Sequence, residues 1–516
     1  MRSTDKDKTL KLSETSTFTR GTTRKSPPSG AALPPQLERR GFRARETMTV
    51  TRRTAIGLGV GAAATALVGT ELGREWWFDR EPSSPPLQDS HGNLVWRNWS
   101  GSASSYPAVR SAPGSEDALV DLLRKTPAPI RPVGAGHSFT SLVPTEGTLL
   151  SLDQMNGIAN HDGSSNMATV WAGTRLGDLG PALAAIGQEM LNLPDINKQS
   201  LGGALGTATH GTGARYQALH GSVRSFRLAT ADGDILECSA EKNPEVFSAA
   251  RVGLGAFGVI TQVTLQNDSL HRVRKRTFLQ STEKTIAEWE SLCAAHRKVE
   301  FFALPFTGLS AVVTTDPTDA AVLPRGPDAE TEALMSLKRL RDLFGWIPPL
   351  RRWLAQSALS GVPEEQAIDD SWKLLSNERP VRFNEMEFHF PREAQMAAMR
   401  EVLSAIEASH HEVFFPLELR SIAQDDAWLS PFYQQESGSI AVHAYYKDDY
   451  TRLFAQIEPI LRRHGGRPHW GKLHSLKARD LQALYPHWRD AMIVRQSLDP
   501  QGRFLNAYLR ELFIDG

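Results

Sequence analysis

The sequence predicts an α+β protein with two domains, and two observations support that prediction. From about Leu94 to residue 268, short strands and short helices alternate between turn signals. After residue 268 the pattern changes to charged helices interrupted by proline-rich breaks, which indicates a second domain with an irregular insert. The chain has 516 residues, which is long enough for two or three ordinary domains.

The elements expected in the first domain follow from caps, turns and apolar runs. Ser115 is a typical N-cap for a helix over 115–123, because acidic residues fill the first turn. An Asp-Gly turn separates two apolar runs between residues 223 and 238, which predicts a hairpin. The other expected elements are strands at 129–133, 148–152, 167–172 and 259–265, and helices at 176–186 and 244–251.

In the second domain the pattern predicts strands at 382–390 and 438–446. Two breaks, at 317–327 and 345–349, contain the prolines of the irregular insert. The basic run from Arg272 to Arg276 is short, and we interpret it as a solvated face.

Residues Gly253–Gly258 match the G-x-G-x-x-G fingerprint of dinucleotide-binding folds, but their context excludes that fold. The fingerprint requires a strand, then the glycines, then a helix. Here a predicted helix precedes the glycines and a predicted strand follows them.

The N-terminal region is typical of an export address. Residues 1–50 are rich in Ser, Thr, Lys, Arg and Pro, so we expect a disordered leader, and Met48 is a natural start. Arg52 and Arg53 precede a Gly- and Ala-rich apolar run, which indicates a twin-arginine signal and linker over 51–93. The sequence therefore predicts export to the periplasm or the exterior. A buried alanine-rich helix and an uncleaved membrane anchor stay open as alternatives.

Charge and cysteine content exclude some classes of function. The 58 basic residues balance the 58 acidic residues, so global charge gives no reason to expect a nucleic acid partner. The two cysteines, Cys238 and Cys293, are too few for a disulfide framework or a cysteine metal site, although one bridge stays open.

The segment Arg131–Phe139 is the most informative in the chain. It is expected to be a strand that enters a glycine turn, where Gly134 and Gly136 let backbone N–H groups approach an anionic ligand. His137 follows at the tip of this turn. A phosphate cradle beside a fixed imidazole suggests a nucleotide cofactor, but taken alone such a turn is more often only a turn.

A second glycine- and hydroxyl-rich stretch, from Asp195 to Gly213, has small residues and N–H donors that suit a pyrophosphate. It is expected to be one long loop, and loops of this length are usually functional or disordered.

Further along the chain, Glu418 and Arg420 stand two residues apart, which places both side chains on one face of a strand. An exposed ion pair is the simple alternative. His443 lies in another predicted strand, and Lys472 follows a Trp-Gly pair, where it could equally be a surface lysine.

Together these motifs resemble the FAD-linked oxidases of the vanillyl-alcohol oxidase (PCMH) type. Within that group the resemblance is to the branch of sugar-1,4-lactone oxidases, including arabinono-lactone and gulono-lactone oxidases, and alditol oxidases. It covers about Leu94 to Leu512, and Gly134–Ser138 and His469–Lys472 are its specific motifs. The resemblance implies a two-part PCMH-type FAD-binding domain over 94–268 and a substrate (cap) domain over 269–465 with an antiparallel sheet flanked by helices. A C-terminal segment over 466–516 would complete the flavin site.

The resemblance also assigns site residues. It implies a single covalent FAD link through His137, because Trp171–Arg175 lacks the cysteine that provides a second link in many relatives. It places Glu418, Arg420, His443 and Lys472 in the catalytic pocket. The residues expected to contact FAD are Arg131, Gly134, Ala135, Gly136, His137, Ser138, Ser200, Gly203, Gly206, Thr207, Thr209, His210, Gly211, Gly258, Val259, Ile260 and Asn506.

The resemblance implies oxidation of a CH–OH group of a polyol or an aldono-1,4-lactone, with hydride transfer to flavin N5 and reoxidation by oxygen or another acceptor. The assigned residue types suit this chemistry. Arg420 or Lys472 can stabilise developing alkoxide charge. His443 or Lys472 can accept the hydroxyl proton, and Glu418 can orient Arg420 or bind a sugar hydroxyl. Tyr445 and the insert over 317–363 depart from the family pattern, so the identity of the substrate stays open.

Two other classes of protein are alternatives. A non-catalytic flavin carrier or scaffold would need no substrate cations, and the motif set contains two. A metal protein could use His464, His469, His474 and His487, but no carboxylate joins these histidines at ligand spacing.

Overall fold

The structure is a computed structural model that describes residue 73 and residues 78–326 and 329–514. The chain divides into two compact units, Met1–Leu67 and Val68–Gly516, and every described residue belongs to the second. The predicted twin-arginine segment lies outside the described residues. Across 78–326 and 329–514, none of the helices combines the length and the apolar character that a membrane span requires.

A small parallel sheet holds the turn that the sequence singles out. β4 (Ile130–Val133) and β3 (Val109–Ser111) both pair with β5 (Thr148–Ser151). Helix α2 (Glu116–Lys125) begins at Ser115, whose hydroxyl accepts a hydrogen bond from the backbone of Ala118, as predicted. Its buried residues Leu119 and Leu123, four apart on one face, pack in the same cluster as Ile130.

A five-stranded antiparallel sheet follows, and it contains the predicted hairpin. Its strand order is β10 (Ile235–Ser239), β9 (Val223–Ala229), β11 (Val259–Gln266), β7 (Met167–Trp171) and β6 (Ile158–Asp162). Alternate residues of β11 are buried, as expected for a strand with one face in the core. The elements around it are α3 (Leu176–Ala184), α4 (Leu201–Gly206), η1 (Leu219–Ser222), α5 (Pro244–Ala250) and the strand pairs β1 (Trp96–Arg97) with β2 (Ser104–Ser105) and β8 (Gln188–Glu189) with β12 (Asp268–Ser269).

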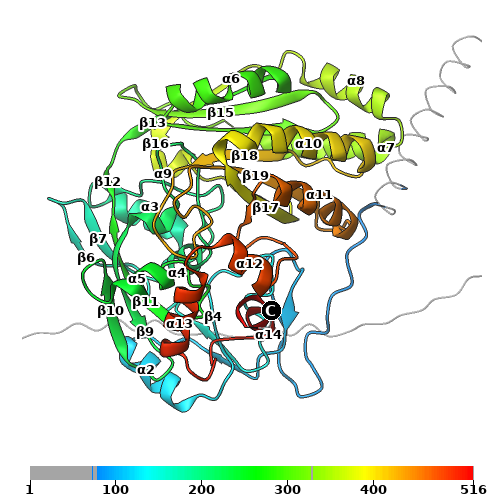
Figure 1. Cartoon of the computed structure of the whole chain (residues 1–516). Coiled ribbons are helices and arrows are strands. Elements are labelled where there is room, and N and C mark those ends of the chain that lie inside the picture. Colours follow the sequence, from blue (N-terminus) through cyan, green and yellow to red (C-terminus); the bar gives the residue numbers. More distant parts are fainter. Residues whose placement is uncertain (1–72, 74–77, 327–328, 515–516) are drawn as a thin grey trace, which may run out of the picture. The chain divides into compact units, whose positions relative to one another are not determined.

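The second half of the chain is built on an eight-stranded antiparallel sheet. Its strand order is β16 (Glu365–Asp370), β13 (Arg272–Ser281), β15 (Leu309–Pro317), β14 (Lys298–Leu304), β18 (Leu417–Ile422), β19 (Ser437–Tyr445), β17 (Phe383–Pro391) and β20 (Arg467–Pro468). Helices α6 (Thr282–Ala295), α10 (Gln395–Ser409) and α11 (Thr451–Arg463) lie along this sheet (Figure 1). The antiparallel sheet flanked by helices is therefore confirmed.

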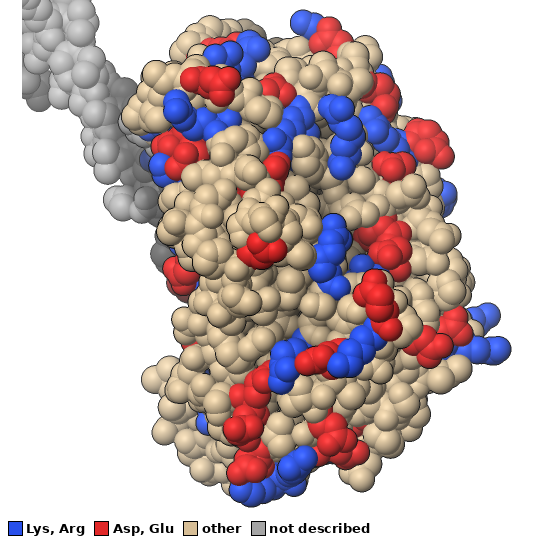
Figure 2. Space-filling model, turned by 90° about the vertical axis from the view of Figure 1, so that its left-hand side faces the viewer, with Lys and Arg blue, Asp and Glu red and all other residues tan. Residues whose placement is uncertain are grey.

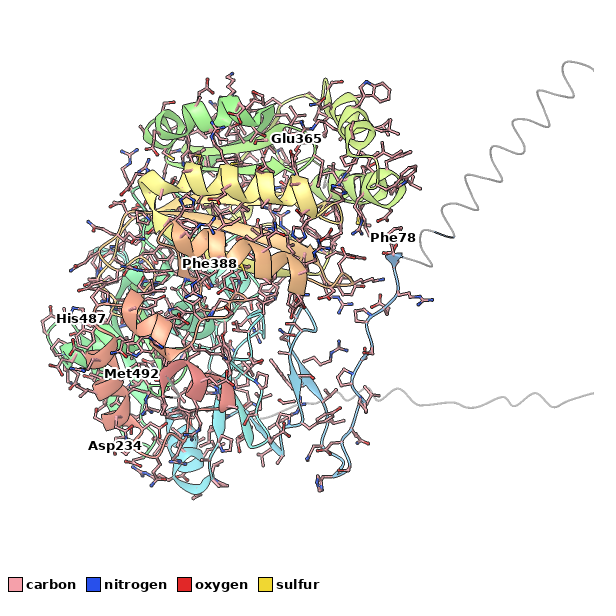
Figure 3. All side chains as sticks on the ribbon, turned by 45° about the vertical axis from the view of Figure 1, so that its right-hand side comes forward. Phe78, Asp234, Glu365, Phe388, His487 and Met492 are labelled. Carbon is pink, nitrogen blue, oxygen red and sulfur yellow. The ribbon has the colours of Figure 1, made fainter. Side chains whose placement is uncertain are left out.

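Strand alternation gives the two faces of this sheet different chemistry. One face is apolar and packs in the main core, where Phe388 and Leu419 are fully buried (Figure 3 labels Phe388). The neighbours Glu387 and Glu418 project from the opposite face, toward the first half of the fold, and both border the cavity described below. We call that second face the inner face.

The C-terminal helices return to the first half of the fold. They are α12 (Ala478–Leu484), α13 (Trp488–Leu498) and α14 (Ala507–Phe513). The backbone N–H of Ile130 donates to the carbonyl of Arg503, and the Arg503 side chain donates to carbonyls of Thr126 and Ala231. The tail is thereby tied to the base of β4.

Three predictions about local structure need correction. The stretch 195–213 is not a single loop, because Ser200 caps helix α4 and accepts a hydrogen bond from the backbone of Gly203. The insert is largely regular, because it forms two helices, α7 (Ala329–Phe344) and α8 (Pro348–Leu359). The short helix α9 (Ser371–Leu374) follows β16, and η2 (Arg392–Ala394) precedes α10. The basic run on β13 is not wholly solvated, since Lys275 is buried.

The described chain also starts before Leu94, inside the predicted linker. Asp79 forms an ion pair with Lys338 of α7, and Glu81 forms one with Lys447. These pairs fasten the segment to the second half of the fold.

Charges of both signs are interspersed over the face shown in Figure 2.

Cys238 and Cys293 are buried free thiols, so they do not form the bridge that the sequence left open.

Candidate active site

A cavity of about 730 Å³ brings together most of the predicted site residues. The turn after β4, helix α4, and the glycine stretch before β11 form one part of its wall. The inner face of the eight-stranded sheet and helices α7 and α8 form the other part. The cavity therefore lies between the two halves of the fold described above.

The glycine turn after β4 is packed so closely that side chains are excluded from it. A Cβ atom on Gly134 would lie 2.1 Å from the hydroxyl oxygen of Ser200, and Gly136 has a φ of +68°. In the described part of the chain, the backbone N–H groups of Ala135, Gly136, His137 and Ser138 donate to no acceptor. A cradle of free N–H groups beside an N-capped helix fits the pyrophosphate of a dinucleotide.

The stretch Gly253–Gly258, excluded as a Rossmann fingerprint, borders the same cavity by a different route. Gly255 has a φ of +64° and approaches Pro132 of β4 closely, and Gly258 has a φ of +145° where the chain enters β11. These glycines bring a strand to the cofactor cavity without the helix that a Rossmann fold requires.

Arg131 shapes the cavity through hydrogen bonds to the backbone of its wall. Its guanidinium is fully buried and donates to the carbonyls of Leu142, Leu254, Gly255 and Phe504. Burial lowers its pKa to about 9. Although Arg131 lines the cavity, its donors hold the surrounding loops in place.

His137 presents a neutral imidazole to the cavity. Trp99 stacks on its ring, with centroids 5.3 Å apart and planes inclined by 25°. Burial, assisted by the positive charges of Lys472 and Arg175, lowers the pKa of His137 to about 4. Neither ring nitrogen hydrogen bonds to another described residue, so at neutral pH a nitrogen lone pair is free.

Glu418 and Arg420 lie on the inner face of β18 and contact each other, as the period of two predicts. Arg420 also donates from Nε to Glu300 of β14 at 2.8 Å. Burial raises the pKa of Glu418 well above its usual range; Arg420 opposes the shift, and Asp195 and Glu300 reinforce it. The guanidinium is therefore oriented at the wall of the cavity by its contacts with Glu418 and Glu300.

His443 and Lys472 meet at a third carboxylate, Glu385. The ammonium of Lys472 is ion-paired with Glu385, and His443 Nε2 lies 3.7 Å from that carboxylate. His443 Nδ1 donates to the carbonyl of Pro416 at 3.1 Å, which leaves the Nε2 lone pair available. Burial lowers the pKa of His443 despite the opposing charge of Glu385.

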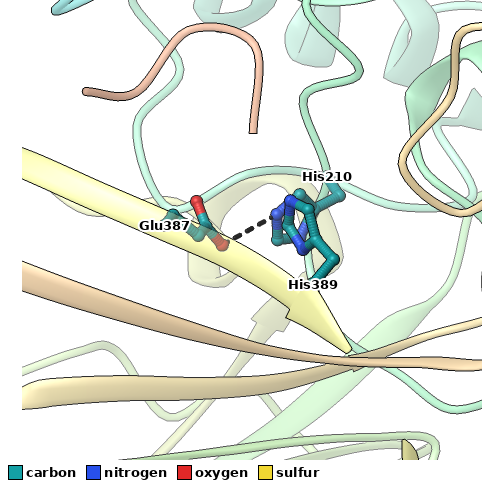
Figure 4. Close-up of side chains that lie close together, drawn as sticks. All are labelled: His210, Glu387 and His389. Atoms are coloured by element: carbon teal, nitrogen blue, oxygen red, sulfur yellow. Dashed lines mark ion pairs between the residues drawn. The ribbon is translucent and has the colours of Figure 1, made fainter. Parts of the chain in front are cut away.

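A second buried network lies next to this cluster (Figure 4). His210 Nδ1 donates to the carbonyl of Gly211, and its Nε2 is 3.0 Å from Glu387 Oε1. The ring of His389 packs edge-on against His210, and neither of its nitrogens has a hydrogen-bond partner among the described residues. The potential ligand atoms of His210, Glu387 and His389 lie within 4.8 Å of one another, a donor set that zinc also accepts.

The structure gathers almost all of the predicted residues at this cavity. Gly211 and Asn506 are the exceptions, because neither borders it. Asn506 instead caps α14 and donates to the carbonyls of Ser141, Leu142 and Pro144. The predicted residues that line the cavity are Arg131, Gly134, Ala135, Gly136, His137, Ser138, Ser200, Gly203, Gly206, Thr207, Thr209, His210, Gly258, Val259, Ile260, Glu418, Arg420, His443 and Lys472.

Sequence reasoning missed several charged residues of the site. Glu385 and Glu387 of β17 and the half-buried Asp195, which border the cavity, were not assigned, and neither was Glu300 of β14, which contacts Arg420. The spacing of Glu385, Glu387 and His389 is the same period of two that placed Glu418 and Arg420 on one strand face, so a signal for a shared face was present in the sequence.

The four histidines of the metal alternative do not assemble. Among the described residues, the groups that could hold a metal contain none of His464, His469, His474 and His487. His464 pairs with Glu401, and His487 stacks on Trp428. That interpretation is therefore not supported.

The fold and the cradle define a flavin-dependent class of protein, and comparisons with known proteins agree. Residues 107–239 match a family described as "FAD binding domain", and residues 263–512 match one described as "D-arabinono-1,4-lactone oxidase". Cholesterol oxidase from Brevibacterium sterolicum shares the fold, with a TM-score of 0.65, 17% identity, and coverage of 84% of this chain and all of that one.

Sequence relatives define the family of this chain more narrowly. It is 33% identical to L-gulono-1,4-lactone dehydrogenase of Mycobacterium tuberculosis over 81% of this chain and 99% of that one. It is 31% identical to L-gulonolactone oxidase of Bos taurus (82% and 99%) and 27% identical to alditol oxidase of a Streptomyces species (81% and 99%). The chain belongs to the FAD-dependent family of sugar-lactone and alditol oxidases and dehydrogenases, which oxidise CH–OH groups.

Proposed function

We propose that this oxidoreductase acts on a CH–OH group of a polyol or an aldono-1,4-lactone and passes the electrons to oxygen or another acceptor. The observation that carries the proposal is the convergence of Glu418, Arg420, His443 and Lys472 on the cavity that contains the glycine turn. A protein that only carries FAD requires neither two cations nor an imidazole with an open Nε2 lone pair at this cavity.

The chain's own residues supply binding and proton transfer. FAD held in the glycine cradle would supply the hydride acceptor for oxidation of the carbinol carbon. His443 Nε2 has a free lone pair and a lowered pKa, so it is neutral near pH 7 and can take the hydroxyl proton. Arg420, held by Glu300 and Glu418, and Lys472, held by Glu385, can stabilise negative charge that develops on the substrate oxygen.

A panel of polyols, aldono-lactones and aldoses, mixed with the purified holoenzyme without oxygen, tests this function. At least one donor should bleach the flavin absorbance within the time of a turnover. If dithionite bleaches the flavin and no member of the panel does, the proposed function is wrong.

We further propose that His137 holds FAD covalently, through a bond between a ring nitrogen and the 8α-methyl carbon of the flavin. The neutral ring, free of hydrogen bonds and fixed by Trp99, supports this attachment. Acid-precipitated protein should stay yellow and show flavin fluorescence in a denaturing gel. His137→Ala should release all flavin on precipitation, whereas Trp96→Ala, also beside the turn, should keep the link.

Export by the twin-arginine pathway is a separate proposal, which rests on Arg52 and Arg53 ahead of the apolar run. Replacement of both arginines by lysine should keep the protein in the cytoplasmic fraction. Equal export of the variant and the parent would contradict it. Extraction of the exported protein from membranes with alkaline buffer would distinguish cleavage from anchoring.

A further inference from the structure

The inner face of the eight-stranded sheet changes from charged to apolar between two neighbouring strands. Glu418 of β18 is paired in register with Phe302 of β14, and Phe302 is paired in turn with Ala311 of β15. Ala311 is paired with Leu279 of β13. All four side chains border the cavity, so Glu418 stands at one end of an apolar row.

Two helices of the insert cover this apolar row. Leu334, Leu337 and Leu340 stand three residues apart on α7, and Ala355 and Leu359 stand four apart on α8. These spacings place each set on one face of its helix. All five residues line the cavity, so these faces enclose open space there.

We infer that this apolar chamber, defined by Leu279, Phe302, Ala311, Leu334, Leu337 and Leu359, binds an apolar substituent of the substrate. The inference rests on the proposed function. It assigns the substrate to the amphipathic alcohols and lactones, with a hydroxyl-bearing head at Arg420 and Lys472 and an alkyl or aryl group in the chamber.

The chemistry of the lining excludes a purely polar substrate as the best ligand. A free polyol has no apolar surface to bury, and it would leave these side chains in contact with water. The chamber also has an end, because two exposed residues, Glu330 in the first turn of α7 and Glu365 at the start of β16, border the cavity (Figure 3 labels Glu365). Carboxylates at that end favour a short substituent over a long chain.

A series of 1-O-alkylglycerols, from methyl to octyl, with glycerol as the parent compound, tests the chamber. The readout is kcat/KM of the holoenzyme with an artificial electron acceptor. Each added methylene should raise kcat/KM about fourfold, which corresponds to about 0.8 kcal/mol, until the chamber is filled. A flat or falling series, with polyols or lactones still oxidised, would overturn the inference and leave the proposed function standing. Failure of every donor in the panel would overturn both.

Two variants on α7 locate the effect. Leu334→Gln places an amide in the chamber, so the ratio of kcat/KM for the hexyl ether to that for glycerol should fall at least fivefold. The adjacent Met335, which does not border the cavity, provides the control, and Met335→Gln should keep the ratio. FAD content and thermal unfolding establish that both variants are folded. Equal ratios in the two variants would contradict the assignment of the chamber.

Discussion

At the scale of single residues, Arg131 shows how a side chain can shape a cofactor site through backbone contacts. Its replacement by Met would leave the carbonyls of Leu142, Leu254, Gly255 and Phe504 without their buried donor. We expect a loss of about 3 kcal/mol or more in the free energy of unfolding, together with loss of FAD. Urea unfolding and flavin content measure both effects. Arg463→Met removes an exposed arginine paired with Glu401, and it should change neither.

His443 gives a prediction about pH. Because burial lowers its folded pKa, the imidazole stays neutral and able to accept a proton to below about pH 6.5, the ordinary value for histidine. Activity should therefore fall only as pH drops through this lowered value. His443→Asn should reduce the rate of flavin reduction roughly 100- to 10,000-fold and remove that acid limb from the profile. A limb centred above pH 6.5, or one that persists in the variant, would contradict the role.

Residue patterns in the sequence identified part of the site and missed another part for a physical reason. The spacing of Glu418 and Arg420 placed both side chains on one strand face, and the family resemblance assigned that face to the substrate pocket. The spacing of Glu385, Glu387 and His389 is equally regular. The role of these carboxylates in the site, however, depends on their contacts with Lys472 and His210, which are distant in sequence. Only the fold supplies those partners.

At the scale of elements, the contact between the glycine turn and α4 can be tested by a matched set of substitutions. Gly134→Ala would place a Cβ atom 2.1 Å from the Ser200 hydroxyl, so FAD content should fall at least tenfold. Ser200→Ala in the same protein removes that oxygen and should restore part of the FAD. Gly163→Ala meets nothing within 4 Å and is the control. A Gly134→Ala protein with full FAD would show that the close approach is not required.

Elements with strong local signals were predictable from sequence, and those held by tertiary contacts were not. The Asp-Gly hairpin and the Ser115 cap are set by neighbouring residues, and both are confirmed. Helix α4 is short and glycine-rich, so its propensity is poor, and its packing against the turn supports it. The prolines of the insert led to a prediction of irregular structure there. Pro348, however, stands at the first position of α8, where proline is favourable.

At the scale of the whole molecule, the half-buried His474 and the buried His469 should make stability depend on pH. Burial lowers the pKa of His474 to about 4 and that of His469 to about 3. Unfolded histidine binds a proton near pH 6.5, so stability is full above that pH and is lost as pH falls toward about 4 and then 3. The urea midpoint should be lower at pH 5 than at pH 7. His474→Leu should reduce this difference, whereas replacement of the exposed His91 should not; an unchanged difference in His474→Leu would contradict the assignment.

The central claim is that Arg420 and its carboxylate partners act on the substrate beside FAD. Anaerobic single-turnover reduction of the flavin, by the best donor of the panel, tests it directly in the parent and in Arg420→Met at equal FAD content. The loss of one preorganised cation should slow reduction roughly 100- to 1,000-fold, with reduction by dithionite unchanged. Equal rates of reduction by the donor in the two proteins would contradict the account.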